Sequence, residues 1–376
     1  VADDGCAEQH CNDITSNETW AAGDHEVTCS FDIHGGATLT IQAGATVYMN
    51  SGTSISVGGS GSGELYADAA SSSAITFTSV AILDGNSPLA GDWDAIYLGA
   101  GHTGQTTFNN VLIEYGGTGD ACLDIDSSVS VDFIDLTVLN CQNAGVIVSG
   151  SGNPSFDNAY LASNGTMGLM VEDNAGLNGF SGTVTGNGAY PVSLPTKVAD
   201  KLDATSSSYL GNGSDQIELR GGTIDGATTL PALDVDYRMT ASTKIEGSGG
   251  ANLTLQGVTV EMASGVNIKV GQASPGDLVI LTSTVTPAKA NPSNGEWGAL
   301  QFGTSTSSLS TIDNSTIEYG GGHGANGMIE CEGASATVSG STIQNSGSWG
   351  IYTSQTCGMT LSNNAYVSNT GGDVNF

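Results

Sequence analysis

Cations are nearly missing from this sequence. Seven Lys and Arg residues stand against 38 Asp and Glu residues, which gives the chain of 376 residues a formal net charge of −31. A protein that binds phosphate groups needs Lys or Arg to displace their counterions. The composition therefore excludes nucleic acid and anionic lipid as partners. The seven cations are Lys197, Lys201, Arg220, Arg238, Lys244, Lys269 and Lys289.

Long apolar runs are missing as well, and the cysteines are widely spread. No 18 consecutive residues are apolar, so we expect no membrane insertion. The seven cysteines include no CxxC pair, which argues against zinc or iron–sulfur ligation. The chain begins at Val1 without an initiator Met, as a secreted protein does after processing. We therefore expect an extracellular protein, secreted or at the cell surface, with two or three disulfides and one cysteine left over.

Amphipathic helical patterns of useful length are also absent. The chain has 55 Gly but only 8 Pro, and short apolar–polar alternations are interrupted every few residues by Gly, Asn or Asp. This pattern predicts many short strands joined by tight turns. Strands without helices between them cannot form a doubly wound sheet.

The sequence repeats itself on a large scale. IEYGG occurs at 113–117 and again at 317–321. Around it, GDWDAIYLG (91–99) aligns with GEWGALQFG (295–303), and DNAYLASNG (157–165) aligns with NNAYVSNTG (363–371). Upstream, TLTIQAGATVYMNSGTSISV (38–57) aligns with NLTLQGVTVEMASGVNIKV (252–270). The chain is therefore a tandem duplication.

A smaller period lies within each copy. Val146, Leu169 and Val192 are 23 residues apart, and so are Ile351 and Val374. A period near 23 with alternating apolar residues is typical of short parallel strands stacked coil upon coil. We predict an all-β solenoid of roughly sixteen coils of about 23 residues.

The phrases TLTIxAG, FTS, GxW and IEYGG resemble those of extracellular right-handed parallel β-helix repeat surface proteins of bacteria and archaea. The resemblance covers nearly the whole chain after about residue 13 and implies a right-handed parallel β-helix. We expect an N-terminal Cys-containing segment or cap at 1–12, a first β-helix copy at 13–200, and a second copy at 201–376 that continues the first.

Paired carboxylates are the strongest candidates for a site. In CLDID (122–126) and MIECE (328–332), inward apolar residues alternate with outward acids. Paired carboxylates suit Ca²⁺, as in the β-helix pectate lyases that this chain also resembles. The predicted metal ligands are Asp124, Asp126, Glu330 and Glu332. An ordinary solvated acidic face is the simpler interpretation.

Other polar residues give weaker signals. Glu114 and Glu318 of the two IEYGG motifs are expected to be structural, at a glycine corner. Trp93 and Trp297 are expected to pack under a long turn, with a sugar-stacking platform as the alternative. The histidines, among them His10 and His25, are scattered and support no Ser–His–Asp triad.

Coil length also suggests disulfide pairs. Cys122 and Cys141 are 19 residues apart, close to one coil, so we expect them to bond. Cys331 and Cys357, which are 26 apart, form a second candidate pair. The pairing among Cys6, Cys11 and Cys29 stays open.

Two functions follow from these observations. The first is a non-enzymatic structural or adhesive protein, a rigid acidic rod that stacks end to end with itself into a head-to-tail homopolymer. The second is a module that binds or cleaves polysaccharide with an acidic, Ca²⁺-dependent face. Glycans are partners only in the second case.

Overall fold

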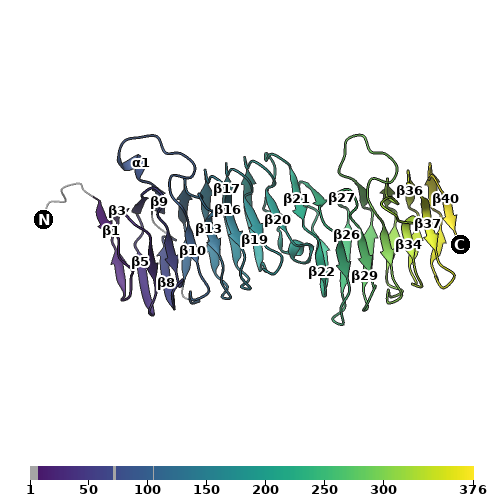
Figure 1. Ribbon diagram of the computed structural model, residues 1–376, viewed down its shortest axis with the longest axis horizontal. Coiled ribbons are helices and arrows are strands. Elements are labelled where there is room, and N and C mark those ends of the chain that lie inside the picture. The colour runs from purple at the N-terminus through teal and green to yellow at the C-terminus, as the bar shows by residue number, and fades with distance from the viewer. Residues whose placement is uncertain (1–6, 71–72, 105) are drawn as a thin grey trace. The chain divides into compact units, whose positions relative to one another are not determined.

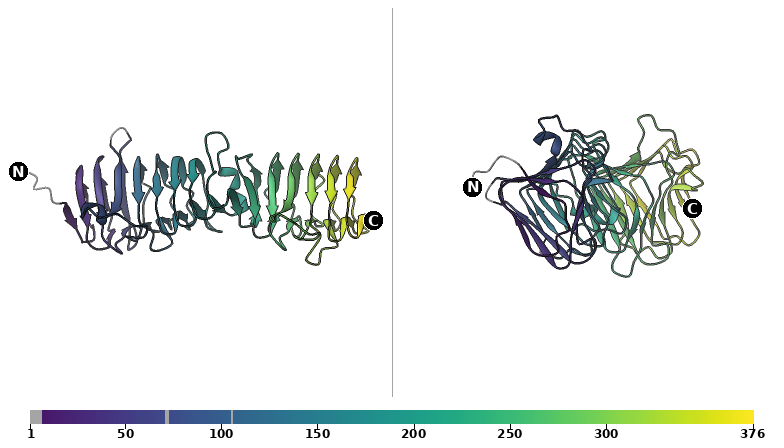
Figure 2. Two further views of the ribbon diagram at one scale, coloured as in Figure 1. Left: turned by 90° about the horizontal axis from the view of Figure 1, so that it is seen from above. Right: turned by 60° about the vertical axis from the view of Figure 1, so that its left-hand side comes forward.

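The chain forms an all-β parallel β-solenoid of about 14 turns. The computed structural model describes residues 7–70, 73–104 and 106–376. Two compact units make up the chain. Unit 1 runs to Ser193 and also includes Lys201–Asp215, and unit 2 comprises Leu194–Asp200 and Gln216–Phe376. Within each unit, short parallel strands lie side by side along successive coils (Figures 1 and 2).

Unit 1 has three stacks of parallel strands; β17 belongs to two of them, and so does β19, which pairs with both halves of β17. The first stack contains β1 (Glu8–His10), β3 (Gly23–Val27), β6 (Ala45–Met49), β9 (Ile75–Ser79), β12 (Val111–Glu114), β15 (Thr137–Leu139) and β17 (Ser155–Ala162). The second contains β2 (Glu18–Trp20), β5 (Ala37–Ile41), β8 (Gly63–Asp68), β11 (Thr107–Asn109), β14 (Asp132–Ile134), β17 and β19 (Gly179–Thr185). The third contains β4 (Phe31–Ile33), β7 (Ile55–Val57), β10 (Ile96–Leu98), β13 (Ala121–Ile125), β16 (Ala144–Val148), β18 (Leu169–Val171) and β20 (Val192–Leu194).

Unit 2 also has three stacks. The first contains β21 (Gln216–Leu219), β24 (Asp236–Met239), β27 (Thr259–Met262), β30 (Thr284–Pro287), β33 (Thr316–Glu318), β36 (Thr342–Gln344) and β39 (Ala365–Val367). The second contains β22 (Gly222–Ile224), β25 (Thr243–Ile245), β28 (Ile268–Val270), β31 (Leu300–Phe302), β34 (Gly327–Cys331), β37 (Trp349–Thr353) and β40 (Gly372–Asn375). The third contains β23 (Ala227–Leu230), β26 (Asn252–Gln256), β29 (Asp277–Leu281), β32 (Thr311–Asp313), β35 (Thr337–Ser339) and β38 (Thr360–Ser362).

Helical structure among the described residues is limited to two short segments. They are α1 (Val80–Leu83) and the 3₁₀-helix η1 (Thr196–Lys201). Ser79 caps α1, because its side chain accepts a hydrogen bond from the N–H of Ala81. Figure 1 shows α1 in a loop that projects from the stacked coils of unit 1.

Alternation along each strand builds the core. In β5, the side chains of Ala37, Leu39 and Ile41 are buried, whereas Thr38 and Thr40 are partly exposed. Because the coils are in register, buried residues form columns. Phe108, Phe133, Phe156 and Phe180 follow one another with ring centroids 5.3, 4.9 and 5.9 Å apart.

A polar column lies at one corner of unit 1. Asn164 donates from Nδ2 to Oδ1 of Asn187 at 2.9 Å, and Asn187 donates in the same way to Asn212 at 2.9 Å. Each amide also binds backbone, for example Nδ2 of Asn187 donates to the carbonyl of Leu161 at 3.1 Å. Buried amides with all these partners satisfy the backbone where the chain turns.

The period of 23 holds in parts of both copies. Val146, Leu169 and Val192 are direct strand partners, and so are Ile351 and Val374. The predicted count of sixteen coils was too high, because some coils carry long loops. Ile55 pairs with Ile96, 41 positions later, and Ile268 pairs with Leu300, 32 positions later.

The alignment of DNAYLASNG with NNAYVSNTG was wrong by one residue. Positive φ angles occur at Asn158 and Ser163 in the first copy and at Asn363 and Ser368 in the second, a constant offset of 205. Leu161 therefore corresponds to Tyr366, which pairs with buried Ile343. Side chains alternate with a period of two, so one slip moves a residue from the outer face to the core.

Three disulfides are present in the part of the chain that the structure describes. Cys122 bonds to Cys141 and Cys331 to Cys357, the two pairs that coil spacing suggested. Cys11 bonds to Cys29, with Cα atoms 4.9 Å apart, which chooses one of the pairings that the sequence left open. Cys6 lies outside the described residues.

The asparagine column predicts a stability effect. Asn187→Ala removes the side-chain acceptor of the backbone N–H and Nδ2 of Asn164, and the side-chain donor to Leu161 and Asn212. We therefore expect the free energy of unfolding to fall by about 2 kcal/mol. Chemical denaturation of the purified protein measures this loss. Asn174→Ala, at an exposed position of the same unit, is the control and should change the free energy by less than about 0.5 kcal/mol. Equal effects of both variants would contradict a role for the column.

Candidate functional site

The two IEYGG motifs lie against the two repeated tryptophans. Trp93 donates from Nε1 to the carbonyl oxygen of Glu114 at 2.8 Å, and Trp297 donates to that of Glu318 at 2.8 Å. Both indoles are fully buried. Because neither ring is exposed, neither tryptophan offers a sugar-stacking platform. Each one anchors the long loop before β10 or β31 to the corner of the next coil.

The first glycine of each motif makes room for this indole. A Cβ atom on Gly116 would lie 2.8 Å from the ring of Trp93, and one on Gly320 would lie 2.6 Å from the ring of Trp297. The preceding tyrosines, Tyr115 and Tyr319, have φ angles of 65° and 59°. The motif is therefore a tight corner that no larger residue could form next to the tryptophan.

The glutamate side chains of the motifs also have partners. Thr78 donates to Glu114 at 2.9 Å, and Thr286 donates to Glu318 at 2.7 Å, in each case from the preceding coil. Burial raises the pKa of Glu114, and the Thr78 hydroxyl partly opposes this. Gln344 of the next coil donates to the second oxygen of Glu318 at 2.6 Å. These contacts link coils.

The corner predicts the effect of one added methyl group. Gly320→Ala pushes a Cβ atom into Trp297, and the displaced indole should cost about 1–3 kcal/mol of unfolding free energy. Gly226→Ala is the control, because a Cβ atom there meets nothing within 4 Å. Thermal unfolding of both variants measures the difference. A melting temperature unchanged by Gly320→Ala would contradict the packing role.

The first predicted acidic pair lies on the third stack of unit 1. Asp124 is partly exposed and follows Tyr97 in the outward column, and Asp126 is exposed just after β13. Burial raises the pKa of Asp124 to about 6, with further contributions from the charges of Asp126, Asp120 and Glu172. The Ser149 hydroxyl opposes this shift. The pKa of Asp124 thus lies well above the ordinary value of an aspartate.

The second predicted acidic pair is arranged differently. Glu330, at the corresponding place in β34, is buried and only 4% exposed. Its carboxylate accepts hydrogen bonds from the N–H groups of Asn326 and Gly327 and from Nε2 of Gln301, the last at 2.8 Å. Glu332 is exposed. The chain itself thus supplies three hydrogen bonds to the carboxylate of Glu330. Ca²⁺ binding at Asp124, Asp126, Glu330 and Glu332 stays a prediction.

The raised pKa of Asp124 predicts a pH dependence of stability. The pKa of Asp124 is higher in the folded state than the unfolded value of 3.8, so protonation of this group stabilises the folded state. Stability from this group is present below about pH 4 and is lost as the pH rises through about 6. Asp124→Asn removes the charge and should stabilise the protein at pH 7.5 by about 1–2 kcal/mol after allowance for solvent screening.

Unfolding at pH 7.5 and at pH 4 measures this effect, and the gain should vanish at pH 4. Glu332→Gln, at an exposed acid of the other copy, is the control. A gain of the same size at both pH values would show that the benefit does not come from ionisation of Asp124.

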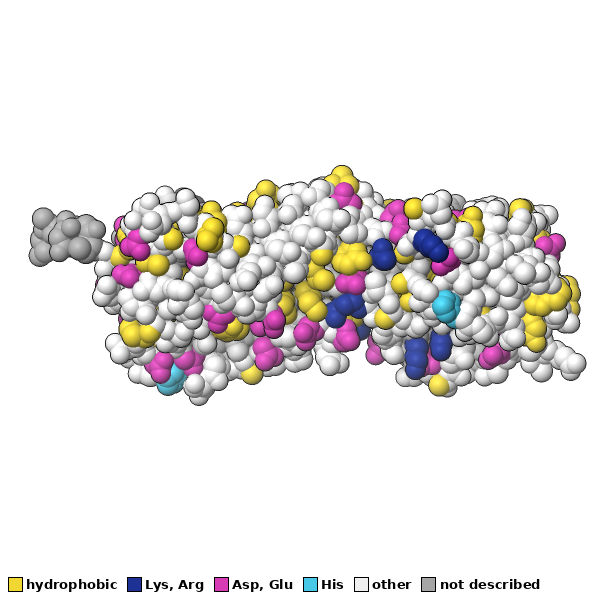
Figure 3. Space-filling view, turned by 45° about the horizontal axis from the view of Figure 1, so that its top comes forward, with side chains coloured by type: hydrophobic (Ala, Val, Ile, Leu, Met, Phe, Trp, Pro, Cys, Tyr) yellow, Lys and Arg dark blue, Asp and Glu magenta, His cyan; other side chains and the backbone are white. Residues whose placement is uncertain are grey.

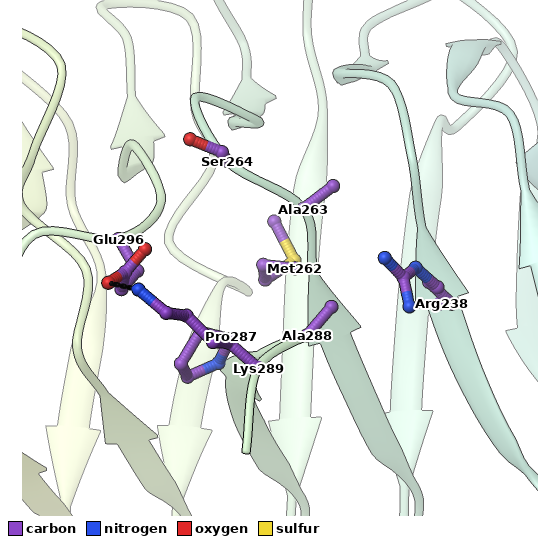
Figure 4. A pocket seen from close by; sticks show the side chains of 8 residues that line it. All are labelled: Arg238, Met262, Ala263, Ser264, Pro287, Ala288, Lys289 and Glu296. Carbon is purple, nitrogen blue, oxygen red and sulfur yellow. Dashed lines mark hydrogen bonds and ion pairs between the residues drawn. The ribbon is translucent and has the colours of Figure 1, made fainter. Parts of the chain in front are cut away.

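Most of the cations lie in unit 2, and some of them surround a small hollow. On the face drawn in Figure 3, Lys and Arg gather in one zone, while Asp and Glu occur over much of the rest. The hollow is about 200 Å³ and is lined by Arg238, Met262, Lys289 and Glu296, among others. Lys289 forms an ion pair with Glu296 at 2.5 Å, as Figure 4 shows. This ion pair lowers the pKa of Glu296. The hollow is small for a ligand site.

Sequence reasoning missed one cluster. Among the described residues, one group of three potential metal ligands has its ligand atoms within 4.8 Å of one another: Glu8, His10 and His25. The first two lie on β1 and the third on β3. The sequence signal that could have revealed this cluster is Glu8-x-His10 followed by His25 one coil later. Its coil is 17 residues long rather than 23, because Glu8 pairs with His25, and the histidines were therefore treated as scattered.

No protein-family model matches the chain, and no curated protein matches it. One solved structure that matches is the catalytic domain of a GH87 alpha-1,3-glucanase in complex with tetrasaccharides. The match covers 96% of this chain, at 11% sequence identity and a TM-score of 0.26. The chain spans 64% of the length of that glucanase chain.

Proposed function

We propose that the protein is a non-enzymatic extracellular structural or adhesive protein that stacks end to end with further copies of itself. The observation that carries this proposal is the use of the repeated residues. Trp93 and Trp297, the two IEYGG motifs and Glu330 are the most prominent features of the duplication. In the structure their polar groups bind the chain's own backbone and side chains. What was duplicated is therefore a device for building coils.

An extracellular location is supported by the cysteines. Disulfides form and persist in oxidising compartments, and three of them join strands or turns of this chain. Among the described residues, no helix has the length and apolar character needed to cross a membrane. Scarcity of Lys and Arg also leaves few cleavage sites for trypsin-like proteases, which suits a protein outside the cell.

Stacking is supported by the last coil of unit 2. Leu361, Tyr366 and Val374 pair with Val338, Ile343 and Ile351, all of which are fully buried. The residues of the last coil continue these core columns but are only partly buried or half-exposed. In this proposal, a coil of a second copy covers these apolar positions and pairs with the edges of β38, β39 and β40.

A second copy of this chain is the proposed occupant. In the first copy, Leu161 corresponds to Tyr366 and is fully buried between Val138 and Val184 of the adjacent coils. The same type of surface is therefore already covered by a following coil within this chain. In the described residues of unit 1 the stacks begin with β1, β2 and β4. Parallel pairing of these edges with those of unit 2 is a head-to-tail contact that does not close.

Charge at the proposed edge tests this assembly. Untagged protein is examined by sedimentation velocity and negative-stain electron microscopy over a range of concentrations, and we expect filaments. Val374→Lys places a cation in the core column of the last coil and should raise the concentration needed for filaments at least tenfold. Leu309→Lys is the control, because Leu309 is 72% exposed in a loop. Single molecules at every concentration, or equal effects of both variants, would rule out stacking.

A second candidate function is supported by Asp124 alone. A half-buried carboxyl group with a pKa of about 6 beside other acids is suited to proton donation in glycoside cleavage. In this case the acidic face around Asp124 and Asp126 binds or cleaves polysaccharide. Incubation with neutral and acidic glycans should then release products or retain the protein, and Asp124→Asn should abolish this effect.

A further inference from the structure

We propose that Glu8, His10 and His25 bind one Zn²⁺ ion in unit 1, a site that is independent of the proposed scaffold function. Nε2 of His10 lies 3.1 Å from Nδ1 of His25, and Oε2 of Glu8 lies 3.8 Å from the same Nδ1 atom. Tetrahedral ligands at about 2.0–2.1 Å from zinc are separated from one another by about 3.4 Å. Small side-chain adjustments bring the three atoms to that spacing.

The fold places these ligands on two paired strands. Glu8 and His10 are two residues apart on β1 and therefore share a face. Glu8 lies opposite His25 of β3, and His10 lies opposite the next inward residue, Val27. The disulfide between Cys11 and Cys29 joins the segments just after these two strands. The ligands are thus held in place by strand pairing and by a covalent link.

The position of the cluster is unusual for polar residues. His25 stands in an inward column that continues as Val47, Phe77, Ile113 and Val138. All four of these residues are fully buried, and His25 itself is only 3% exposed. A polar ring at a core position is costly unless its nitrogen atoms have partners. Each ring nitrogen of His25 therefore needs a hydrogen-bond partner or a metal ion.

Hydrogen bonds in the cluster show which nitrogen is free to bind metal. Nε2 of His25 lies 2.8 Å from the carbonyl oxygen of Ala21, which only accepts, so Nε2 carries the proton and Nδ1 carries a lone pair. A histidine that binds a metal ion through one ring nitrogen usually donates the N–H of the other to a backbone carbonyl or a carboxylate.

His10 favours the metal-bound arrangement for a second reason. Without metal, Nε2 of His10 must donate its hydrogen to Nδ1 of His25. The other nitrogen of His10, Nδ1, is then unprotonated, and its lone pair faces the Glu18 carboxylate at 3.7 Å. With zinc on Nε2, the proton moves to Nδ1 and points at that carboxylate. Trp20 holds Glu18 through Nε1 at 2.7 Å and stacks on the His10 ring with centroids 3.9 Å apart. Glu18 and Trp20 thus orient the His10 ligand.

The ligand chemistry selects the ion. Two imidazole nitrogens and one carboxylate suit Zn²⁺, whereas Ca²⁺ and Mg²⁺ prefer a full set of oxygen ligands. Three protein ligands leave a fourth tetrahedral position for water or for a group from another molecule.

Metal binding by the untagged, disulfide-intact full chain tests this proposal. Protein is treated with EDTA, exchanged into metal-free buffer and titrated with Zn²⁺ in a calorimeter. We expect one Zn²⁺ per chain and a higher melting temperature with Zn²⁺ than without it. The same site loaded with Co²⁺ should show the visible absorption of a tetrahedral complex.

Three variants identify the ligands. Glu8→Gln changes a side chain that is 71% exposed, so folding is kept, and it should weaken Zn²⁺ binding at least tenfold. His10→Gln should do the same and remove the Co²⁺ spectrum. His323→Gln, an exposed histidine of unit 2, is the control and should bind Zn²⁺ as the unchanged protein does. The proposal would be overturned by a lack of Zn²⁺ binding, by Glu8→Gln or His10→Gln binding Zn²⁺ as tightly as the unchanged protein, or by Ca²⁺ displacing Zn²⁺ at equal concentration.

Discussion

Parallel strands in register make every side chain a neighbour of the residue at the same place in the next coil, and the rest of this structure depends on that constraint. A column must suit all its members at once. Apolar columns such as Phe108–Phe133–Phe156–Phe180 supply the core, and the asparagine column supplies hydrogen bonds at a turn. Loops lie outside the columns. A coil can therefore gain a long loop before β10 or β31 without disturbing the coils on either side.

The same constraint makes a polar residue in a buried column costly. Burying a charged or polar group costs free energy unless the group finds partners. Glu330 in β34 is one such residue, and Gln301 and two backbone N–H groups meet the need. His25 is another, where an apolar column ends on a histidine and then on Glu8. In the first case the chain supplies the partners itself, and in the second an ion completes them.

Much of this fold could be predicted from sequence, because alternation and period record the columns directly. Strands around Val146, Leu169 and Val192 are spaced as the period of 23 requires. Strand register is harder to predict, because an alignment shifted by one residue still matches similar residues but exchanges the core face of the strand with its outer face. This is why Leu161 and Tyr366 were not recognised as equivalent. The zinc ligands were missed for a related reason: the missing CxxC pair addressed cysteine ligands only, and the short first coil hid the pairing of Glu8 with His25.

Duplication lets the two copies solve one problem in different ways. Asp124 and Glu330 occupy matching positions. Asp124 pairs with Tyr97 and Glu330 pairs with Gln301, and each of these partners lies four residues after a repeated tryptophan. In the second copy, amide groups fix the carboxylate of Glu330. In the first, Tyr97 donates to Asp94 instead, and burial, together with the charges of acidic neighbours, raises the pKa of Asp124 to about 6. The carboxylate of Glu330 is held by hydrogen bonds from amide groups, whereas Asp124 lies among other acids and has a raised pKa. The two copies thus keep a carboxyl group at the same place in the coil but surround it with different partners.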